Sequence, residues 1–245
     1  MPQIARTVLI AFALLALGAP SLAQQAPALT RAQIEQIVRE YLLNNPEIIV
    51  EAIETLEARQ RQAKQADQRD AIAAHKDQLY RDADAPVAGN PNGDVTLVEF
   101  FDYRCPYCKQ VAPALTQLLK EDNKLRFVFK ELPILGPDSV IAARAALAAN
   151  AQGKYMAMHS ALLRHRGSYD EATVLRIATE AGLDAARLKA DMAKPEIEAM
   201  IDRNRSLARA LSLTGTPAFI IGDKVVPGAA DLETLKMLVA EARKR

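Results

Sequence analysis

The two cysteines of this 245-residue chain stand two residues apart, as Cys105-Pro106-Tyr107-Cys108. A pair at this spacing can open and close a disulfide, and so exchange two electrons with another pair of thiols. A zinc site needs about four ligands, but the chain has no second cysteine pair and its 3 histidines lie far from the motif. A structural disulfide across so short a loop would remove little chain entropy. The spacing therefore predicts a redox-active pair.

The residues around Cys105 predict that a strand ends and a helix begins there. An apolar run, Leu97–Phe101, follows the turn residues Asn92-Gly93-Asp94, which is typical of a buried strand. After Cys105 the apolar residues recur at helical spacing, and Pro106 occupies the first turn, where a missing N–H does no harm. The unpaired N–H groups and partial positive charge at a helix start favour a thiolate. We therefore expect Cys105 to attack and Cys108 to be its less exposed partner.

The rest of this region predicts one more strand, a long helical stretch and a hairpin. The expected elements are strands at 125–130, 216–221 and 224–226 and helices at 138–150, 154–164, 170–181, 184–193, 195–211 and 231–243. Asp138, Asp170 and Asp184 are the expected N-caps of three of these helices. The order predicts an α/β fold in which a helical insertion, at about 138–211, separates a strand–helix–strand unit from a hairpin and a helix.

These residues carry a resemblance to a known family. The stretch FFDYRCPYC, Phe100–Cys108, together with Gly215-Thr216-Pro217, is similar to the DsbA-like branch of the thioredoxin superfamily. The resemblance covers the chain from about Pro86 to its end and implies a thioredoxin fold with an inserted helical domain. The dipeptide Pro106-Tyr107, which is expected to tune the redox potential, also occurs in glutaredoxins. The long separation of the cysteines from the Thr-Pro pair is instead the mark of the DsbA branch.

The resemblance also implies roles for residues outside the cysteine pair. Pro217 is expected to follow a cis peptide bond beside the active cysteine, although most X-Pro bonds are trans, and the backbone of Thr216 to pair with an extended substrate. Glu99 interrupts the apolar strand, where an unpartnered carboxylate is costly. It is expected to exchange a proton with Cys108, with Lys130 as its partner. The alternative is that Glu99 and Lys130 each reach solvent at a strand edge.

The first residues, Met1–Ala23, have the pattern of a cleaved secretory signal: a basic residue, an apolar run, and small residues before the expected break. The run is too short to span a bilayer comfortably, which argues against an uncleaved anchor, so we expect no membrane insertion after cleavage. Cleavage leaves Lys+Arg at 31 − 1 = 30 against Asp+Glu 30, a balance that gives no electrostatic footprint for nucleic acid. We expect a periplasmic protein in an oxidising compartment.

The segment 24–81 is predicted to be an all-helical arm. Thr30 and Gln33 have the spacing of a capping box, and Asn45 is expected to cap a second helix that begins at Pro46. Large apolar side chains form a stripe on one face: Ile34, Ile37, Val38, Tyr41, Leu42, Ile49, Ile53 and Leu56. From Glu57 to Gln78 the sequence is mostly polar and is expected to run exposed as a stalk.

Short helices with one apolar face need a surface that covers it. The alternatives are the chain's own catalytic domain and other copies of the arm, and we favour self-association into a dimer or trimer. A helical segment followed by a DsbA-like domain is similar to the suppressor-of-copper-sensitivity C proteins, and this resemblance implies an N-terminal segment that oligomerises the catalytic domains.

The sequence thus predicts a signal peptide at 1–23, a helical arm at 24–81 and a DsbA-like thioredoxin domain at 82–245. The predicted function is that of an exported thiol-disulfide oxidoreductase, an isomerase or oxidase, which reacts with substrate proteins and with a membrane redox partner. No bound cofactor is needed, because the cysteine pair carries the electrons. The alternative is a carrier that holds copper(I) on both thiolates, although no Met-rich or His-rich tract supports it.

Overall fold

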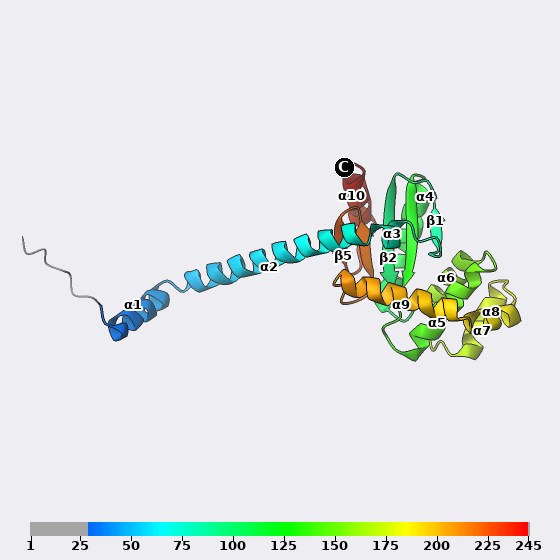
Figure 1. The fold of residues 1–245 in the computed structure, drawn as a ribbon, viewed down its shortest axis with the longest axis horizontal. Helices are drawn as coiled ribbons and strands as arrows, with labels where there is room; N and C mark the ends of the chain where they lie inside the picture. The colour runs from blue at the N-terminus through cyan, green and yellow to red at the C-terminus, as the bar shows by residue number, and fades with distance from the viewer. Residues whose placement is uncertain (1–28, 245) are drawn as a thin grey trace, which may run out of the picture. The chain divides into compact units, whose positions relative to one another are not determined.

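The computed structural model of the chain describes residues 29–244 (Figure 1). These residues divide into two compact units, the first ending at Leu56 and the second beginning at Glu57. Helix α2, Glu47–Ala74, has residues in both units. The predicted signal peptide, 1–23, lies outside the described residues. Within them, no helix is both long enough and apolar enough to cross a membrane.

The first unit begins with α1, Arg31–Asn44. The predicted capping box is present, because the Thr30 hydroxyl accepts from the N–H of Gln33 and the Gln33 side chain accepts from the N–H of Thr30 at 2.9 Å. Asn45 differs from the prediction. Its backbone and side-chain N–H groups both donate to the carbonyl of Tyr41, so Asn45 closes α1 instead of capping α2.

The apolar stripe of the first unit is exposed in the single chain. No side chain of α1 is buried, and the first buried residue of α2 is Ile72, which belongs to the second unit. Apart from the half-buried Leu42, the predicted stripe residues are 47–57% exposed: Ile34, Ile37, Val38, Tyr41, Ile49, Ile53 and Leu56. This face therefore lacks the cover that the sequence pattern requires.

The second unit is built on a five-stranded sheet with the order β1-β3-β2-β4-β5. The strands are β1 Val87–Gly89, β2 Val95–Phe101, β3 Leu125–Glu131, β4 Ala218–Ile221 and β5 Lys224–Pro227. β2 and β3 are parallel, as the predicted strand–helix–strand unit requires, and every other neighbouring pair is antiparallel.

Alternation of side chains along the strands gives one apolar cluster on each face of the sheet. On the first face, Leu97, Phe127 and Phe219 pack with α4, Pro106–Glu121, and with α10, Leu232–Arg243. This face carries the cysteine pair, since both cysteines belong to the same cluster.

The other face is covered by the end of α2, by α3, Lys76–Tyr80, and by the end of α9, Pro195–Ala210. Ile72 and Leu79 from the first two elements are 4% and 0% exposed and pack with Leu207. The predicted stalk is therefore not exposed along its whole length, because its last turns complete the core of the second unit.

The helical insertion lies between β3 and β4 and contains α5 Pro137–Asn150, α6 Tyr155–Arg164, α7 Glu171–Glu180, α8 Ala185–Met192 and α9. Figure 1 shows these helices gathered beside one end of the sheet. Asp170 and Asp184 cap α7 and α8 as predicted. Asp138 does not cap α5, which begins one residue earlier; its carboxylate accepts from the N–H of Tyr169 at 2.9 Å. The architecture is the predicted thioredoxin fold with a helical insertion, preceded by helices.

Candidate active site

Cys105 occupies the N-cap of α4, at the end of the loop that follows β2. Its N–H donates to the carbonyl of Asp102 at 3.0 Å, and its thiol donates to the carbonyl of Thr216 at 3.1 Å. The peptide bond between Thr216 and Pro217 is cis, as the resemblance implied. A reactive sulfur at a helix start therefore faces a backbone carbonyl that comes from 111 residues further along the chain.

Cys108 lies one turn inside α4 and is 1% exposed, against 5% for Cys105. Burial, followed by the negative charge of Glu99, raises the pKa of the Cys108 thiol well above its ordinary value. Cys108 thus keeps its proton until another group removes it.

Glu99 is 3% exposed and points from β2 to the face that carries both cysteines. Burial, followed by the charge of Glu131, raises the pKa of Glu99 to about 8. Glu99 also lines a cavity of about 590 Å³ between α4 and α6. A carboxyl group with a pKa of about 8 therefore lies between Cys108 and a space open to solvent.

Lys130 does not partner Glu99, in contrast to the prediction. In the parallel register of β2 and β3, Glu99 lies beside Phe129 and Lys130 lies beside Phe100, so the two charged side chains point to opposite faces. The Lys130 ammonium, which is 1% exposed as a residue, pairs instead with Asp82 at 2.5 Å. This pair lies on the second face of the sheet.

A cluster of buried polar side chains beside Glu99 was not predicted. Glu131, the last residue of β3, accepts a hydrogen bond from the phenol of Tyr155, and its second carboxylate oxygen has no partner among the described residues. Burial raises the pKa of Glu131 to about 7. The phenol of Tyr103 and Nδ1 of His159 are 3.0 Å apart, and burial lowers the pKa of His159 to about 3. His159 is thus a neutral core residue.

Asp102 organises the loop that carries Cys105 and was also missed. One of its carboxylate oxygens accepts from the N–H of Arg104 and from the hydroxyl of Ser139, each at 2.8 Å. The other accepts from the N–H groups of Ile134 and Leu135 at 2.9 and 3.1 Å. One buried carboxylate thereby joins the loop after β2 to the loop after β3.

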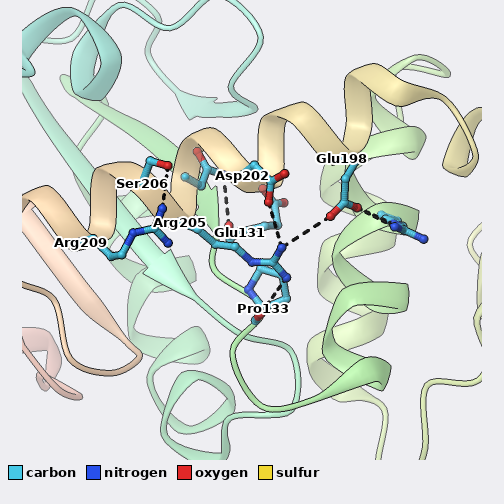
Figure 2. A network of polar contacts seen from close by, with 9 residues as sticks. Glu131, Pro133, Glu198, Asp202, Arg205, Ser206 and Arg209 are labelled. Carbon is cyan, nitrogen blue, oxygen red and sulfur yellow. Dashed lines mark hydrogen bonds and ion pairs between the residues drawn. The ribbon is translucent and has the colours of Figure 1, made fainter.

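Helix α9 holds the loop after β3 from the other side (Figure 2). The side chain of Asn204 donates to the carbonyl of Glu131 at 3.1 Å, and the guanidinium of Arg205 donates to the carbonyl of Pro133 at 3.4 Å. Arg205 is itself held by ion pairs with Asp202 and Glu198 at 3.0 and 3.5 Å. The insertion therefore fixes the backbone that surrounds the cysteines.

A cysteine pair at a helix start, facing a cis-proline loop on a thioredoxin fold, defines a thiol-disulfide exchange protein. The chain belongs to the DsbA-like thioredoxin domain family, whose model matches residues 96–240. A second model, that of the copper resistance protein ScsC N-terminal domain, matches residues 31–63. The predicted combination of an ScsC-type arm and a DsbA-like domain is thereby confirmed.

Solved structures agree with both parts of this assignment. A thioredoxin-like oxidoreductase from Silicibacter pomeroyi is 49% identical, with a TM-score of 0.67, over 69% of this chain and 98% of its own. ScsC of Proteus mirabilis in a transitional conformation is 32% identical, with a TM-score of 0.67, over 89% of this chain and 98% of its own.

Among curated proteins, the chain is similar to Na(+)/H(+) antiporter NhaA 1 of Salinispora arenicola, at 34% identity over 158 residues. This match covers 64% of the chain but 24% of the antiporter. The chain thus spans about a quarter of the length of the curated relatives that it matches.

Proposed function

We propose that the chain is a periplasmic thiol-disulfide oxidoreductase that acts on proteins as a disulfide isomerase or oxidase. The observation that carries the proposal is the contact between the Cys105 thiol and the Thr216 carbonyl. An extended substrate that paired with this backbone would bring its own sulfur next to Cys105. The export expected from residues 1–23 would place the reaction in an oxidising compartment.

The reaction proceeds by two exchanges of sulfur. The Cys105 thiolate attacks a substrate disulfide, a mixed disulfide forms, and the leaving substrate sulfur takes the electron pair. Cys108 then loses its proton to the carboxylate form of Glu99 and attacks the Cys105 sulfur, which releases the second substrate thiolate and leaves Cys105 and Cys108 joined. Two electrons have moved from the pair to the substrate, and a membrane partner restores the reduced pair. Oxidation of a substrate is the reverse sequence. Isomerisation occurs when another thiolate of the substrate, instead of Cys108, breaks the mixed disulfide, which forms a new substrate disulfide, releases the Cys105 thiolate and moves no net electrons.

The exposed stripe of the first unit supports self-association. Burying a large apolar side chain stabilises an assembly by roughly 1.5–3 kcal/mol, and the stripe offers seven such residues that are about half exposed in the single chain. A dimer or trimer would present two or three cysteine pairs to one substrate. Several reduced pairs around one substrate favour reshuffling of wrong disulfides over simple oxidation.

Refolding of scrambled ribonuclease in a glutathione buffer tests this function. The chain from residue 24 onward should restore ribonuclease activity, and it should restore it faster than the same chain without residues 24–56. Both forms should oxidise a dithiol peptide at similar rates per site, while Cys105→Ser should abolish both reactions. If the full chain oxidised the dithiol peptide but did not restore ribonuclease activity, the protein would be an oxidase and not an isomerase.

A second candidate function is the capture of copper(I) by the reduced pair. Both thiols are free in the structure, and the family model for the arm is described as that of a copper resistance protein. Thiolates are soft ligands that suit this ion. Equilibrium titration with a copper(I) indicator decides between the functions. A carrier must bind copper(I) tightly and lose this binding in Cys108→Ser, whereas an oxidoreductase does not need to bind copper(I).

A further inference from the structure

A groove of about 370 Å³ connects the Thr216-Pro217 loop with the second half of α2. One side is formed by residues of the loop, such as Leu213 and Thr216, and by Pro227 at the end of β5. The other side is formed by α2 side chains: Arg61, Lys64, Gln65 and Gln68. The groove therefore begins at the backbone that faces Cys105 and continues along a helix outside the thioredoxin fold.

Contacts within the second unit hold α2 in this place. The side-chain amide of Gln68 donates to the carbonyl of Leu211 at 3.4 Å. Arg69 pairs with Asp223 at 3.8 Å, and Ile72 is 4% exposed. The polar side of the groove is thus formed by α2, and the last turns of the same helix belong to the core.

The charged side chains that line the groove are all basic. Among the described residues that line it, the charged ones are Arg61 and Lys64, and no carboxylate is present. Arg61 makes one ion pair, with Glu57 at 3.2 Å, between side chains that are 65% and 58% exposed, so solvent screens the pair strongly. No ion pair links Lys64 to another described residue. The groove therefore offers two positive charges to a ligand that lies along it.

Resting on the proposed function, we propose that α2 forms the outer wall of the substrate groove and that Arg61 and Lys64 select extended polypeptide segments with acidic residues beside the reacting cysteine. Charge complementarity supports this occupant, because both charged side chains that line the groove are cations. Continuity with the site supports it too, since Thr216 belongs both to the groove and to the contact with Cys105.

Of the two selecting residues, Arg61 lies inside the family model for the arm and Lys64 lies outside both family models. These models match residues 31–63 and 96–240, so Lys64, Gln65 and Gln68 fall between them. The preference for acidic segments is therefore inferred for this chain and not for the DsbA-like domain in general.

Three peptides test the proposal on the full reduced chain. Each carries a central cysteine linked to thionitrobenzoate, flanked by four residues of Asp, Ser or Lys. Attack by Cys105 forms the Cys105–peptide disulfide, breaks the original one and releases thionitrobenzoate with the electron pair, which is followed by its absorbance. At low ionic strength the Asp peptide should react roughly three- to tenfold faster than the Lys peptide, because each of two exposed charge pairs contributes modestly. Added salt should reduce this ratio.

Matched variants locate the preference. Arg61→Glu with Lys64→Glu should reverse it, and Arg61→Gln with Lys64→Gln should remove it. Arg59→Glu with Lys76→Glu makes the same change in net charge at exposed residues that do not line the groove, and should keep the preference. An unchanged ratio in the first variant, or an equal change in the control, overturns the proposal. Failure of every peptide to react would instead overturn the proposed function.

Discussion

At the scale of single residues, the two sulfurs differ in their surroundings more than in their exposure. Both are nearly covered, but Cys105 lies at a helix start beside a backbone carbonyl, and Cys108 lies inside the helix near a carboxyl group. The N-terminal end of a helix stabilises a negative sulfur, whereas burial and the charge of Glu99 oppose ionisation of Cys108. The division of labour between the sulfurs follows from this difference.

Alkylation of the reduced protein should therefore select Cys105. At pH 7 we expect iodoacetamide to react with Cys105 at least about tenfold faster than with Cys108, because only the thiolate reacts and Cys108 remains protonated. Peptide mass mapping after short reaction times measures the ratio, with Cys105→Ser as the control for the rate at Cys108. Preferential labelling of Cys108 would reverse the assignment of attacking and resolving cysteines.

The raised pKa of Glu99 makes stability depend on pH. The folded pKa of about 8 exceeds the usual value for a glutamate, so the stability linked to the protonated carboxyl is complete at pH 4 and is lost as the pH rises to about 8. Glu99→Gln abolishes this loss. Urea unfolding of the reduced protein measures the free energy of unfolding. Relative to wild type, that of the variant should rise by on the order of 2 kcal/mol between pH 5 and pH 8.5. The same change at the exposed Glu54 should give no such gain. If the free energy of unfolding depended on pH in the same way in Glu99→Gln and in wild type, Glu99 would not be a buried, protonated carboxyl group.

At the scale of elements, one buried carboxylate makes most of the side-chain hydrogen bonds between the loops after β2 and β3, and the guanidinium of Arg104 adds one to the carbonyl of Leu135. Asp102 accepts four hydrogen bonds from the two loops and from α5, and α9 holds the second loop through Asn204 and Arg205. Because these loops flank the start of α4, the insertion contributes to the position of Cys105 without touching it.

Removal of the Asp102 carboxylate should be much more damaging than removal of one of its partners. Asp102→Ala leaves several N–H groups without an acceptor and should lower the free energy of unfolding by about 3 kcal/mol, whereas Ser139→Ala removes one hydrogen bond and should lower it by about 1 kcal/mol. Urea denaturation measures both. Similar losses in the two variants would mean that water satisfies the loop N–H groups.

The elements were predictable because their patterns are strong. The apolar run at 97–101 is typical of a buried strand, and the apolar residues after Cys105 recur at helical spacing. The strand and the helix were therefore both predicted at nearly their observed positions. Pairing across the sheet was not predictable in the same way. The proposed link between Glu99 and Lys130 failed because the register of β2 and β3 turns them to opposite faces, and the sequence does not specify that register.

Isolated buried polar residues carried a weaker signal. Glu99 was found because it interrupts an apolar run, but Glu131 was missed because the predicted strand ended at Lys130. The alternation of Leu125, Phe127 and Phe129 continues to Glu131 and would have marked it as a buried carboxylate. Asp102 had no periodic neighbour, and its four partners come from separate parts of the chain.

At the scale of the whole molecule, the boundary between the units does not coincide with the predicted end of the arm. Prediction placed it between 81 and 82, and the compact units divide between Leu56 and Glu57. The residues from Gln68 onward make contacts within the catalytic unit, and Ile72 and Leu79 fill its core. The last turns of α2 therefore belong structurally to the second unit.

Two truncations distinguish the arm from this core segment. Without residues 1–56 the protein should be a monomer by light scattering and keep its stability, since none of the described residues at 29–56 is buried. Without residues 1–78 it should also lose about 2–4 kcal/mol in urea unfolding, because removal of Ile72 opens a cavity in the core. A monomeric mass for the chain from residue 24 onward would show that the stripe does not associate, and equal stability of the two truncations would contradict the core role of α2.

The positions of the tyrosines give the molecule a built-in optical probe. The chain has 6 tyrosines and no tryptophan, and three of the tyrosines, Tyr103, Tyr155 and Tyr169, are at most 4% exposed in the cluster between the sheet and the insertion. Tyr41 and Tyr107 are more than half exposed. Rigid, closely packed phenol rings dominate near-ultraviolet circular dichroism in the absence of indole. The near-ultraviolet signal should therefore change when the packing around the cysteine pair changes, and it should change little when the first unit is altered.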